Sequence, residues 1–180
     1  MQHLTTPDNI RKNARSVASN LGDNRIDPYI EEVEQRIVKP RIGHELFIDL
    51  LEWVNATDKT QFPKEYDTLM DGGYYNAVIC GNTEKRLFKG LQTAINYYVY
   101  AKILKNNSLN VTRFGNVFKD DEHSSPIDPK IIFAAEKDAL QVADGYMSEC
   151  IDYLNVTKNI TKFKRAGKQN NRFSLTVLHT

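Results

Sequence analysis

Residues 89–118 read KGLQTAINYYVYAKILKNNSLNVTRFGNVF, and the rest of the chain can be understood outward from this stretch. Its first half predicts a helix whose apolar side chains point in nearly every direction at about 100° per residue. A helix with so little polar surface must be buried among other elements. The second half, residues 111–118, is too short and too glycine-interrupted for a helix, and it predicts an arm that leaves the bundle. We therefore expect other helices to surround the first half and a partner to contact the second.

The length and charge of the chain limit the classes of protein that it can belong to. Its 180 residues suffice for one domain, or one domain with arms, that buries a sizeable core. Lys and Arg total 24 and Asp and Glu total 23, so the net charge is near zero. A dedicated nucleic-acid coat or a polybasic membrane binder would carry a strong excess of cations. The sequence has neither a charged-then-apolar leader nor a run of about 18 apolar residues, so we expect no signal peptide or transmembrane span.

Helix start signals and apolar periodicity predict an all-α fold. Proline directly after a capping Thr or Asp favours helix initiation, and this signal occurs at Pro7, Pro28 and Pro129. A proline inside a helix removes a hydrogen bond, so Pro40 is expected to stop or kink the second helix. Gly145 is expected to mark a close contact of the last and longest helix. The predicted helices span residues 7–20, 28–40, 42–55, 63–70, 91–104 and 128–155.

Glutamates and other polar residues form the expected solvent-facing side of the second helix. These residues are Glu31, Glu32, Glu34, Gln35 and Arg36. Their alternation with apolar positions predicts an amphipathic helix with one buried stripe.

Two extended runs on either side of Gly81-Asn82 predict a small β-hairpin over about residues 74–88. A lone two-stranded hairpin is marginally stable in water, so it needs the bundle or another chain to lie against. The predicted architecture is therefore a helical bundle with a long C-terminal helix, a small β-hairpin and extended arms. We divide it into a helical domain, residues 1–158 with an arm at about 109–125, and a basic extended tail, residues 159–180.

The tail is basic and polar between residues 159 and 171, with almost no acidic side chains. Its cations could contact DNA phosphates, which are bound without sequence preference and in a salt-sensitive way, or a partner protein. The final FSLTVLHT alternates apolar and polar residues, so it could add to another chain as an edge strand; a tail disordered in the isolated protein is the alternative. The candidate contact residues are Lys162, Lys164, Arg165, Lys168 and Arg172.

No catalytic or nucleotide-binding motif is recognisable in the chain. The phosphate loop, G-x-G-x-x-G, G-x-S-x-G and H-E-x-x-H patterns do not occur. The acidic run of residues 120–123 lacks the alternating oxygen ligands of a calcium loop, so we interpret it as solvated. Cys80 and Cys150 have no CxxC spacing, which predicts free thiols of an intracellular protein. We expect no enzyme activity, no metal and no cofactor, and this favours an assembly protein.

Several segments follow one another in a characteristic order between residues 27 and 155. They are DPYIEEVEQRIVKPRIGHELFIDLLE, the LMDGG turn, LFKGLQTAINYYVYAKIL, VTRFGNVFKDDEHSSPID and the terminal ECIDYLN. In order and spacing, this series resembles the head-to-tail connector (adaptor) proteins of tailed bacteriophages, including ring proteins of crass-like phages.

The resemblance implies a structural virion protein with an all-helical bundle and protruding arms. It implies a ring of twelve copies beneath the portal protein, at the head–tail junction, after synthesis in the cytoplasm of the bacterial host. The implied partners are further copies, the portal, tail or further ring proteins, and genomic DNA that passes without sequence specificity; a membrane is not among them. The family's arm falls here on residues 111–125. The interface candidates are Val111, Thr112, Arg113, Phe114, Gly115, Val117 and Phe118.

Two other hypotheses remain open at this stage. The chain could be a small helical DNA-binding or DNA-packaging-associated protein that uses its basic tail. It could also be an enzyme without a recognisable motif. A duplex affinity that depends steeply on salt and is lost with the tail would favour the DNA-binding protein.

Overall fold

The structure, a computed structural model, describes residues 3–15, 17, 21–79, 81–106, 109–112, 115–118, 128–157 and 159–163. It is mainly helical and includes a small antiparallel hairpin, as the sequence predicts. The elements are α1 (Pro7–Asn13), α2 (Asp23–Val33), the π-helical segment η1 (Glu34–Val38), α3 (Lys39–Ile42), α4 (His44–Asn55), α5 (Glu65–Asp71), β1 (Gly73–Ile79), β2 (Asn82–Phe88), α6 (Leu91–Asn106), β3 (Leu109–Thr112), β4 (Gly115–Phe118) and α7 (Pro129–Val156).

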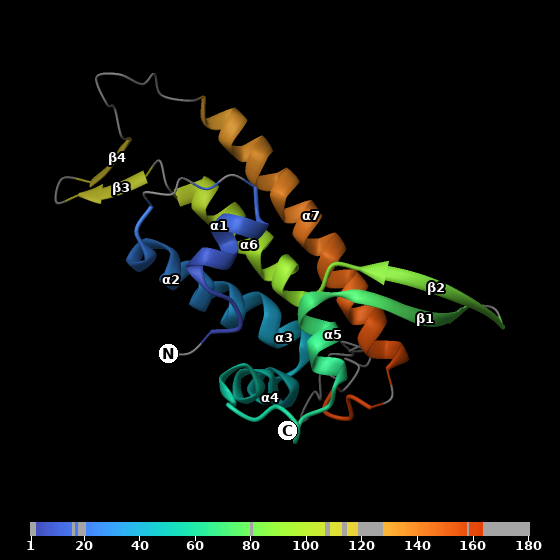
Figure 1. Cartoon of the computed structure of the whole chain (residues 1–180). Coiled ribbons are helices and arrows are strands. Elements are labelled where there is room, and N and C mark those ends of the chain that lie inside the picture. Colours follow the sequence, from blue (N-terminus) through green and yellow to red (C-terminus); the bar gives the residue numbers. More distant parts are fainter. Residues whose placement is uncertain are drawn as a thin grey trace, which may run out of the picture.

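The pair of helices α6 and α7 forms the axis of the molecule (Figure 1). Helices α1, α2 and α5 contact α6 as well. The expectation that α6 is surrounded by other elements is confirmed, because eight of its side chains are buried. They are Leu91, Ala94, Ile95, Asn96, Tyr98, Val99, Ala101 and Ile103. The long helix α7 begins at Pro129, with the Asp128 side chain accepting from the Lys130 N–H, as predicted.

The second helix starts earlier than its proline suggested. Gly22 is the N-cap, Asp23 the first helical residue, and Pro28 lies inside the helix. The prediction of a start at Pro28 is therefore wrong. Ile26 in the first turn is 0% exposed, so burial of this side chain gives a reason for the helix to begin before the proline.

Pro40 does not stop the helical path. The chain passes from α2 through the π-helical turns of η1 into α3, with Pro40 in the first turn of α3. In η1 the Lys39 N–H bonds to the Glu34 carbonyl, five residues back. Such a π-bulge absorbs an irregularity in the helical hydrogen-bond ladder, here directly before the residue that lacks an N–H. The helix ends at Gly43, whose φ is +90°.

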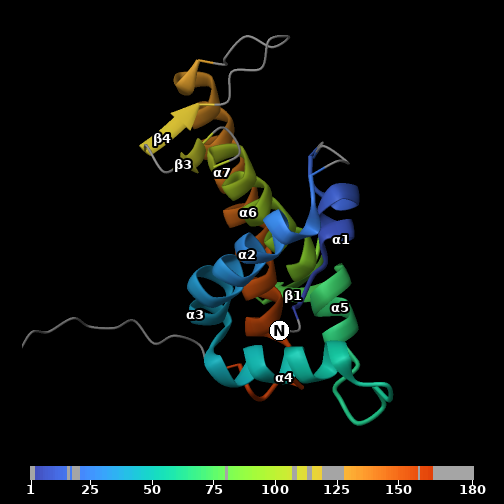
Figure 2. The same cartoon turned by 90° about the vertical axis from the view of Figure 1, so that its left-hand side faces the viewer.

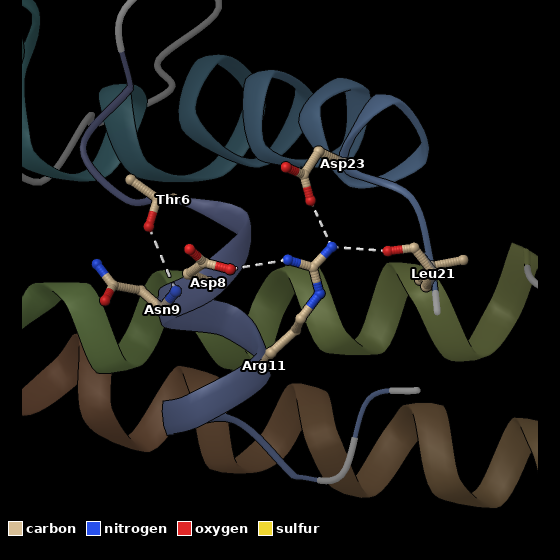
Figure 3. A network of polar contacts seen from close by, with 6 residues as sticks. All are labelled: Thr6, Asp8, Asn9, Arg11, Leu21 and Asp23. Carbon is tan, nitrogen blue, oxygen red and sulfur yellow. Dashed lines mark hydrogen bonds and ion pairs between the residues drawn. The ribbon is translucent and has the colours of Figure 1, made fainter. Parts of the chain in front are cut away.

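Helix α1 is shorter than predicted, ending at Asn13 rather than residue 20, because Ala14 is extended. Arg11 then joins α1 to the start of α2 (Figure 3). Its guanidinium donates to Asp8 Oδ1 at 2.9 Å, to the Leu21 carbonyl at 2.7 Å and to the Asp23 carboxylate. This one side chain therefore links α1 to the start of α2.

Both hairpins are antiparallel. The predicted hairpin is confirmed: β1 and β2 pair Gly73 with Phe88 and Ile79 with Asn82, and Gly81 in the turn has a φ of +84°. The sequence predicted only an arm for the second, where β3 pairs with β4 from Leu109 opposite Phe118 to Thr112 opposite Gly115. In both views this second hairpin and α4 lie at opposite ends of the molecule (Figure 2).

Gly145 does not mark a close helix contact. A Cβ built at this position meets nothing within 4 Å apart from the helix's own nearby backbone. The prediction is therefore wrong, and the glycine lies on an exposed part of α7.

Candidate interaction surface

The hairpin β1–β2 is attached to the bundle by one face only. Tyr75, on that face, meets the ring of Phe88 edge-on at 5.6 Å and that of Tyr153 on α7 at 5.5 Å. Phe88 stacks on Tyr153 at 4.7 Å, with 22° between the ring planes. Ala77, on the same face, is 5% exposed. These contacts provide the support that a two-stranded hairpin needs.

The opposite face of the hairpin, which we call the outer face, exposes three large apolar side chains among the polar Asn76, Thr83 and Lys85. Tyr74 is 65% exposed, Val78 70% and Leu87 54%. Tyr74 lies directly across the strands from Leu87, so the two side chains share this face. The Lys85 ammonium lies 4.5 Å from the centre of the Tyr74 ring. In Figure 1 the hairpin extends away from the helices toward its turn.

The first turns of α7 form a second exposed apolar region. Ile131 is 61% exposed and Phe133 62%, and the first buried residue of this helix is Ala139. In Figure 1 these turns rise above the other helices. Contiguous exposed apolar patches, rather than single exposed apolar side chains, mark surfaces that contact another protein.

The predicted interface residues lie on the second hairpin or outside the described residues. Val111 and Thr112 belong to β3, and Gly115, Val117 and Phe118 belong to β4. Arg113 and Phe114 lie outside the described residues. The five described positions therefore come together on one two-stranded ribbon.

The predicted tail contacts are described only at Lys162. Its ammonium pairs with the Asp49 carboxylate on α4. Asn159 donates to Glu65, and Ile160 is 3% exposed, so the start of the tail packs onto the domain. The other tail candidates, Lys164, Arg165, Lys168 and Arg172, lie outside the described residues.

A polar hollow of about 420 Å³ lies beneath this start of the tail. On its wall, Asp49 is 7% exposed and accepts a hydrogen bond from the Tyr66 hydroxyl. Burial, and then the hydrogen bond to Asp49, raise the pKa of Tyr66 above its ordinary value. The volume is within the range of small-ligand sites. The lining residues are Asp49, Glu52, Gln61, Phe62, Pro63, Tyr66, Asn159, Thr161 and Lys162.

A second buried carboxylate holds the N-terminal segment in place. Glu34, expected on the solvent-facing side of its helix, is instead 2% exposed. It accepts from the Leu4 N–H at 2.6 Å and contacts His3 Nδ1 at 2.9 Å. Burial raises the pKa of the Glu34 carboxyl, and the hydrogen bonds from His3 and Leu4 oppose this effect. The prediction for Glu34 is wrong because the preceding Ile26, Ile30 and Val33 place it beside the buried stripe.

The variant Glu34→Gln should gain stability relative to the natural protein as the pH rises from about 4 to about 7. A carboxyl whose pKa is raised by folding stabilises the folded state most below its ordinary pKa. That contribution is lost as the pH rises through the folded pKa. Urea unfolding of both proteins across this range measures the difference, with Glu31→Gln on the exposed side of α2 as the charge-matched control. A difference between Glu34→Gln and the natural protein that does not change with pH would contradict the prediction.

Tyr98 ties three helices together at the rim of the core. Its ring is 2% exposed, and its hydroxyl donates to Asp144 Oδ1 at 2.5 Å. Arg41 pairs with the same carboxylate oxygen at 2.7 Å. Arg41 comes from α3, Tyr98 from α6 and Asp144 from α7. The pairing of the Arg41 and Asp144 charges therefore connects helices, which is a structural role.

Few reactive or metal-binding side chains occur elsewhere among the described residues. The Cys150 thiol is 0% exposed, and burial raises its pKa to about 12, so it is not a nucleophile at neutral pH. Among the residues that the structure describes, no three His, Cys, Asp or Glu side chains gather closely enough to hold a metal ion. The acidic run of residues 120–123 lies outside the described residues. None of the described helices has the length and apolarity needed to cross a membrane.

Comparison with known proteins finds one family, described as a family of unknown function and designated DUF6712, which matches residues 38–172. The chain belongs to DUF6712. The matched part includes both hairpins, α6 and α7, whereas α1 and α2 precede it. No curated protein and no solved structure shows a significant match to the chain.

Asp49 was not predicted as a site residue and Glu34 was predicted to face solvent, although the spacing of apolar residues places both beside a buried stripe. Asp49 lies between Leu46 and Trp53 on the buried side of α4, three residues after one and four before the other. A carboxylate at an apolar helical spacing is expected to be buried and therefore paired.

Proposed function

We propose that this DUF6712 protein is a structural subunit of a tailed-bacteriophage virion, a head-to-tail connector that forms a ring between the portal and the tail. The observation that carries the proposal is the exposure of Tyr74, Val78 and Leu87 on the outer face of a projecting hairpin. A hairpin that is packed on one face and exposes large apolar side chains on the other is suited to a contact with a further chain.

The location of the exposed side chains favours a ring over a symmetric pair. The outer face and the first turns of α7, with Ile131 and Phe133, are different surfaces on different parts of the chain. Contacts between two unlike surfaces are heterologous, and they generate rings when the rotation between subunits closes. The resemblance implies twelve copies and a location at the head–tail junction of the virion.

The near-neutral charge of the chain supports a role as a DNA conduit. Its formal net charge is +1, so the protein as a whole does not attract phosphates strongly. A ring through which genomic DNA passes must not hold the DNA tightly. Residues 111–118 remain the proposed contact with a neighbouring ring or the portal, since β3 and β4 project from the end of α6 (Figure 1).

Electron microscopy of the purified protein, alone and with the portal protein, tests the proposal. We expect closed rings, and we expect the double variant Val78→Ser and Leu87→Ser to remain folded but to lose them. Both side chains are more than half exposed, so each replacement should change stability by less than about 0.5 kcal/mol. A natural protein that stays monomeric with its portal, or rings that persist in the double variant, would contradict the proposal. A monomer that binds duplex DNA with a steep salt dependence would favour the DNA-binding alternative.

A further inference from the structure

The start of α7 carries an unbroken apolar run, residues 131–135, with the sequence IIFAA. None of these five side chains is buried. Ile132 lies one turn before Glu136, which pairs with Lys105 on α6, so this side of the run turns toward the bundle. The other sides of the run are exposed. An apolar run left open on a protein surface indicates a contact with another chain.

Three residues of the run form one continuous convex surface, which we call the apolar ridge. Ile131 is 61% exposed, Phe133 is 62% exposed, and Ala134 is exposed as well. At about 100° per residue, Ile131 and Phe133 lie roughly 200° apart around the helix, and Ala134 lies between them. The ridge therefore covers about half of the helix circumference, on the side that faces away from Ile132.

The outer face of the hairpin cannot cover the ridge of its own chain. The hairpin is anchored on Tyr153, which follows Ile131 by 22 residues of the same helix. This separation corresponds to about 33 Å along the axis of α7. A strand of seven residues spans only about 23 Å, and the hairpin extends away from the helices toward its turn (Figure 1). Both apolar surfaces of one chain are thus open to other chains.

The outer face is suited to pack on a helix, because the inner face of the same ribbon already does so. Tyr75 and Phe88 contact the ring of Tyr153 near the end of α7. On the outer face, Tyr74 and Leu87 lie opposite each other at the base of the strands, and Val78 lies nearer the turn. A two-stranded ribbon gains stability from support on its faces, and a second helix on the outer face would complete that support.

The charge of Lys85 disfavours a symmetric contact between two outer faces. Asn76 and Lys85 form the middle row of the outer face, between the pair Tyr74–Leu87 and the residues nearer the turn. A two-fold contact between outer faces would stack the two middle rows and bring two Lys85 ammonium groups together. Like charges placed opposite each other destabilise such a contact.

The ridge offers Lys85 a carboxylate instead. Asp128 is exposed and lies three residues before Ile131, so it adjoins the Ile131 side of the ridge. The exposed lysines beside the ridge, Lys130 and Lys137, are three residues before and four residues after Phe133, and they adjoin its other side. Charge complementarity therefore favours an orientation in which Lys85 lies toward the Ile131 side.

We propose that the outer face of the hairpin binds the apolar ridge of α7 in a second copy of the chain. Each hairpin is then packed between two copies of the same helix, the end of its own α7 and the start of its neighbour's. The contact is heterologous, so every copy uses both surfaces at once. The inference rests on the proposed ring, for which it names the two surfaces that meet.

Thiol cross-linking between two variants tests the contact. Both variants are made in a Cys80→Ser background; one carries Val78→Cys and the other Ala134→Cys, and the buried Cys150 does not react. Both positions are exposed, and both substitutions are small, so folding and assembly should be retained. With a short bis-maleimide, co-expressed variants should form a covalent pair, whereas each variant alone should not. A chain that carries both cysteines should give a ladder that ends at the copy number of the ring.

A matched control and electron microscopy of the same samples separate the possible outcomes. Ile48→Cys on α4, at a position that is 41% exposed, replaces Ala134→Cys in the control and should give no covalent pair. Cross-linking of Val78→Cys alone would show a symmetric contact and overturn the inference. Rings without a covalent pair between the two variants would also overturn it, while the proposed ring would stand. Cross-linked filaments would support the contact and contradict the connector, and a chain that stays monomeric with its portal would contradict both.

Discussion

Replacing Gly90 with alanine should lower the free energy of unfolding by roughly 3–5 kcal/mol, a large part of the stability of an ordinary domain. Gly90 has a φ of +81°, which strains any residue with a side chain. In addition, a Cβ at this position would lie 2.4 Å from the backbone nitrogen of Gly72 and 2.4 Å from the Met70 carbonyl oxygen. Backbone atoms cannot move aside as a flexible side chain can.

Gly90 is required because the chain segments that enter and leave the β1–β2 hairpin cross closely at its base. Gly72 precedes β1 and Gly90 follows β2, and each would clash with the backbone at the other's position if it carried a Cβ. This close crossing sets the direction in which the hairpin leaves the bundle. It also positions the start of α6 directly after the hairpin.

Alanine variants of two other glycines distinguish the cost of backbone strain from the cost of a steric clash when their free energies of unfolding are measured. Gly43 has a φ of +90°, but a Cβ there would meet nothing within 4 Å, so Gly43→Ala should cost only about 1–2 kcal/mol. Gly145 lies in α7 with open space around it, so Gly145→Ala should stabilise the protein by about 1 kcal/mol. Chemical denaturation of the three variants checks the order. If Gly90→Ala costs no more than Gly43→Ala, the backbone crossing does not constrain the fold as argued.

The parts of the fold that sequence analysis predicted correctly are those that local patterns determine. The apolar run of α6, the proline start of α7 and the glycine turn at Gly81 each lie within one segment. The predictions are wrong where packing between distant segments determines the bounds of a helix. Helix α2 begins before Pro28 because Ile26 is buried, and the π-helical turns carry the chain past Pro40.

The exposed face of the hairpin could not be predicted from the alternation along β1. Tyr74 and Val78 lie on one side of the strand, and Tyr75 and Ala77 lie on the other. Both sides carry apolar side chains, and Asn76 is the one polar residue between Tyr74 and Val78, so the sequence distinguishes only weakly between the face that packs on the bundle and the face left open. The position of Tyr153 on α7 determines which face packs on the bundle, because its ring contacts the rings of both Tyr75 and Phe88.

Phe88→Ala should lower stability, whereas Leu87→Ala should leave stability almost unchanged and weaken assembly, although the two residues are neighbours in β2. Phe88 is 2% exposed and stacks on Tyr153 at 4.7 Å. Its truncation leaves a cavity between the hairpin and α7, at an expected cost of about 3–5 kcal/mol in the free energy of unfolding. Leu87 is 54% exposed, so its truncation should cost less than about 0.5 kcal/mol.

When only folded protein is compared, substitution of Leu87 should weaken assembly and substitution of Phe88 should not. We expect Leu87→Ala to remain fully folded by chemical denaturation and to weaken ring formation, because it removes apolar surface from the outer face. The variant Phe88→Leu retains most of the buried volume, and it should assemble normally in conditions where it is folded. Light scattering at matched concentrations of folded protein measures the mass of the assembly. If Leu87→Ala assembles like the natural protein, and Tyr74→Ala does too, the outer face is not a contact between subunits, and the hairpin projects for some other purpose.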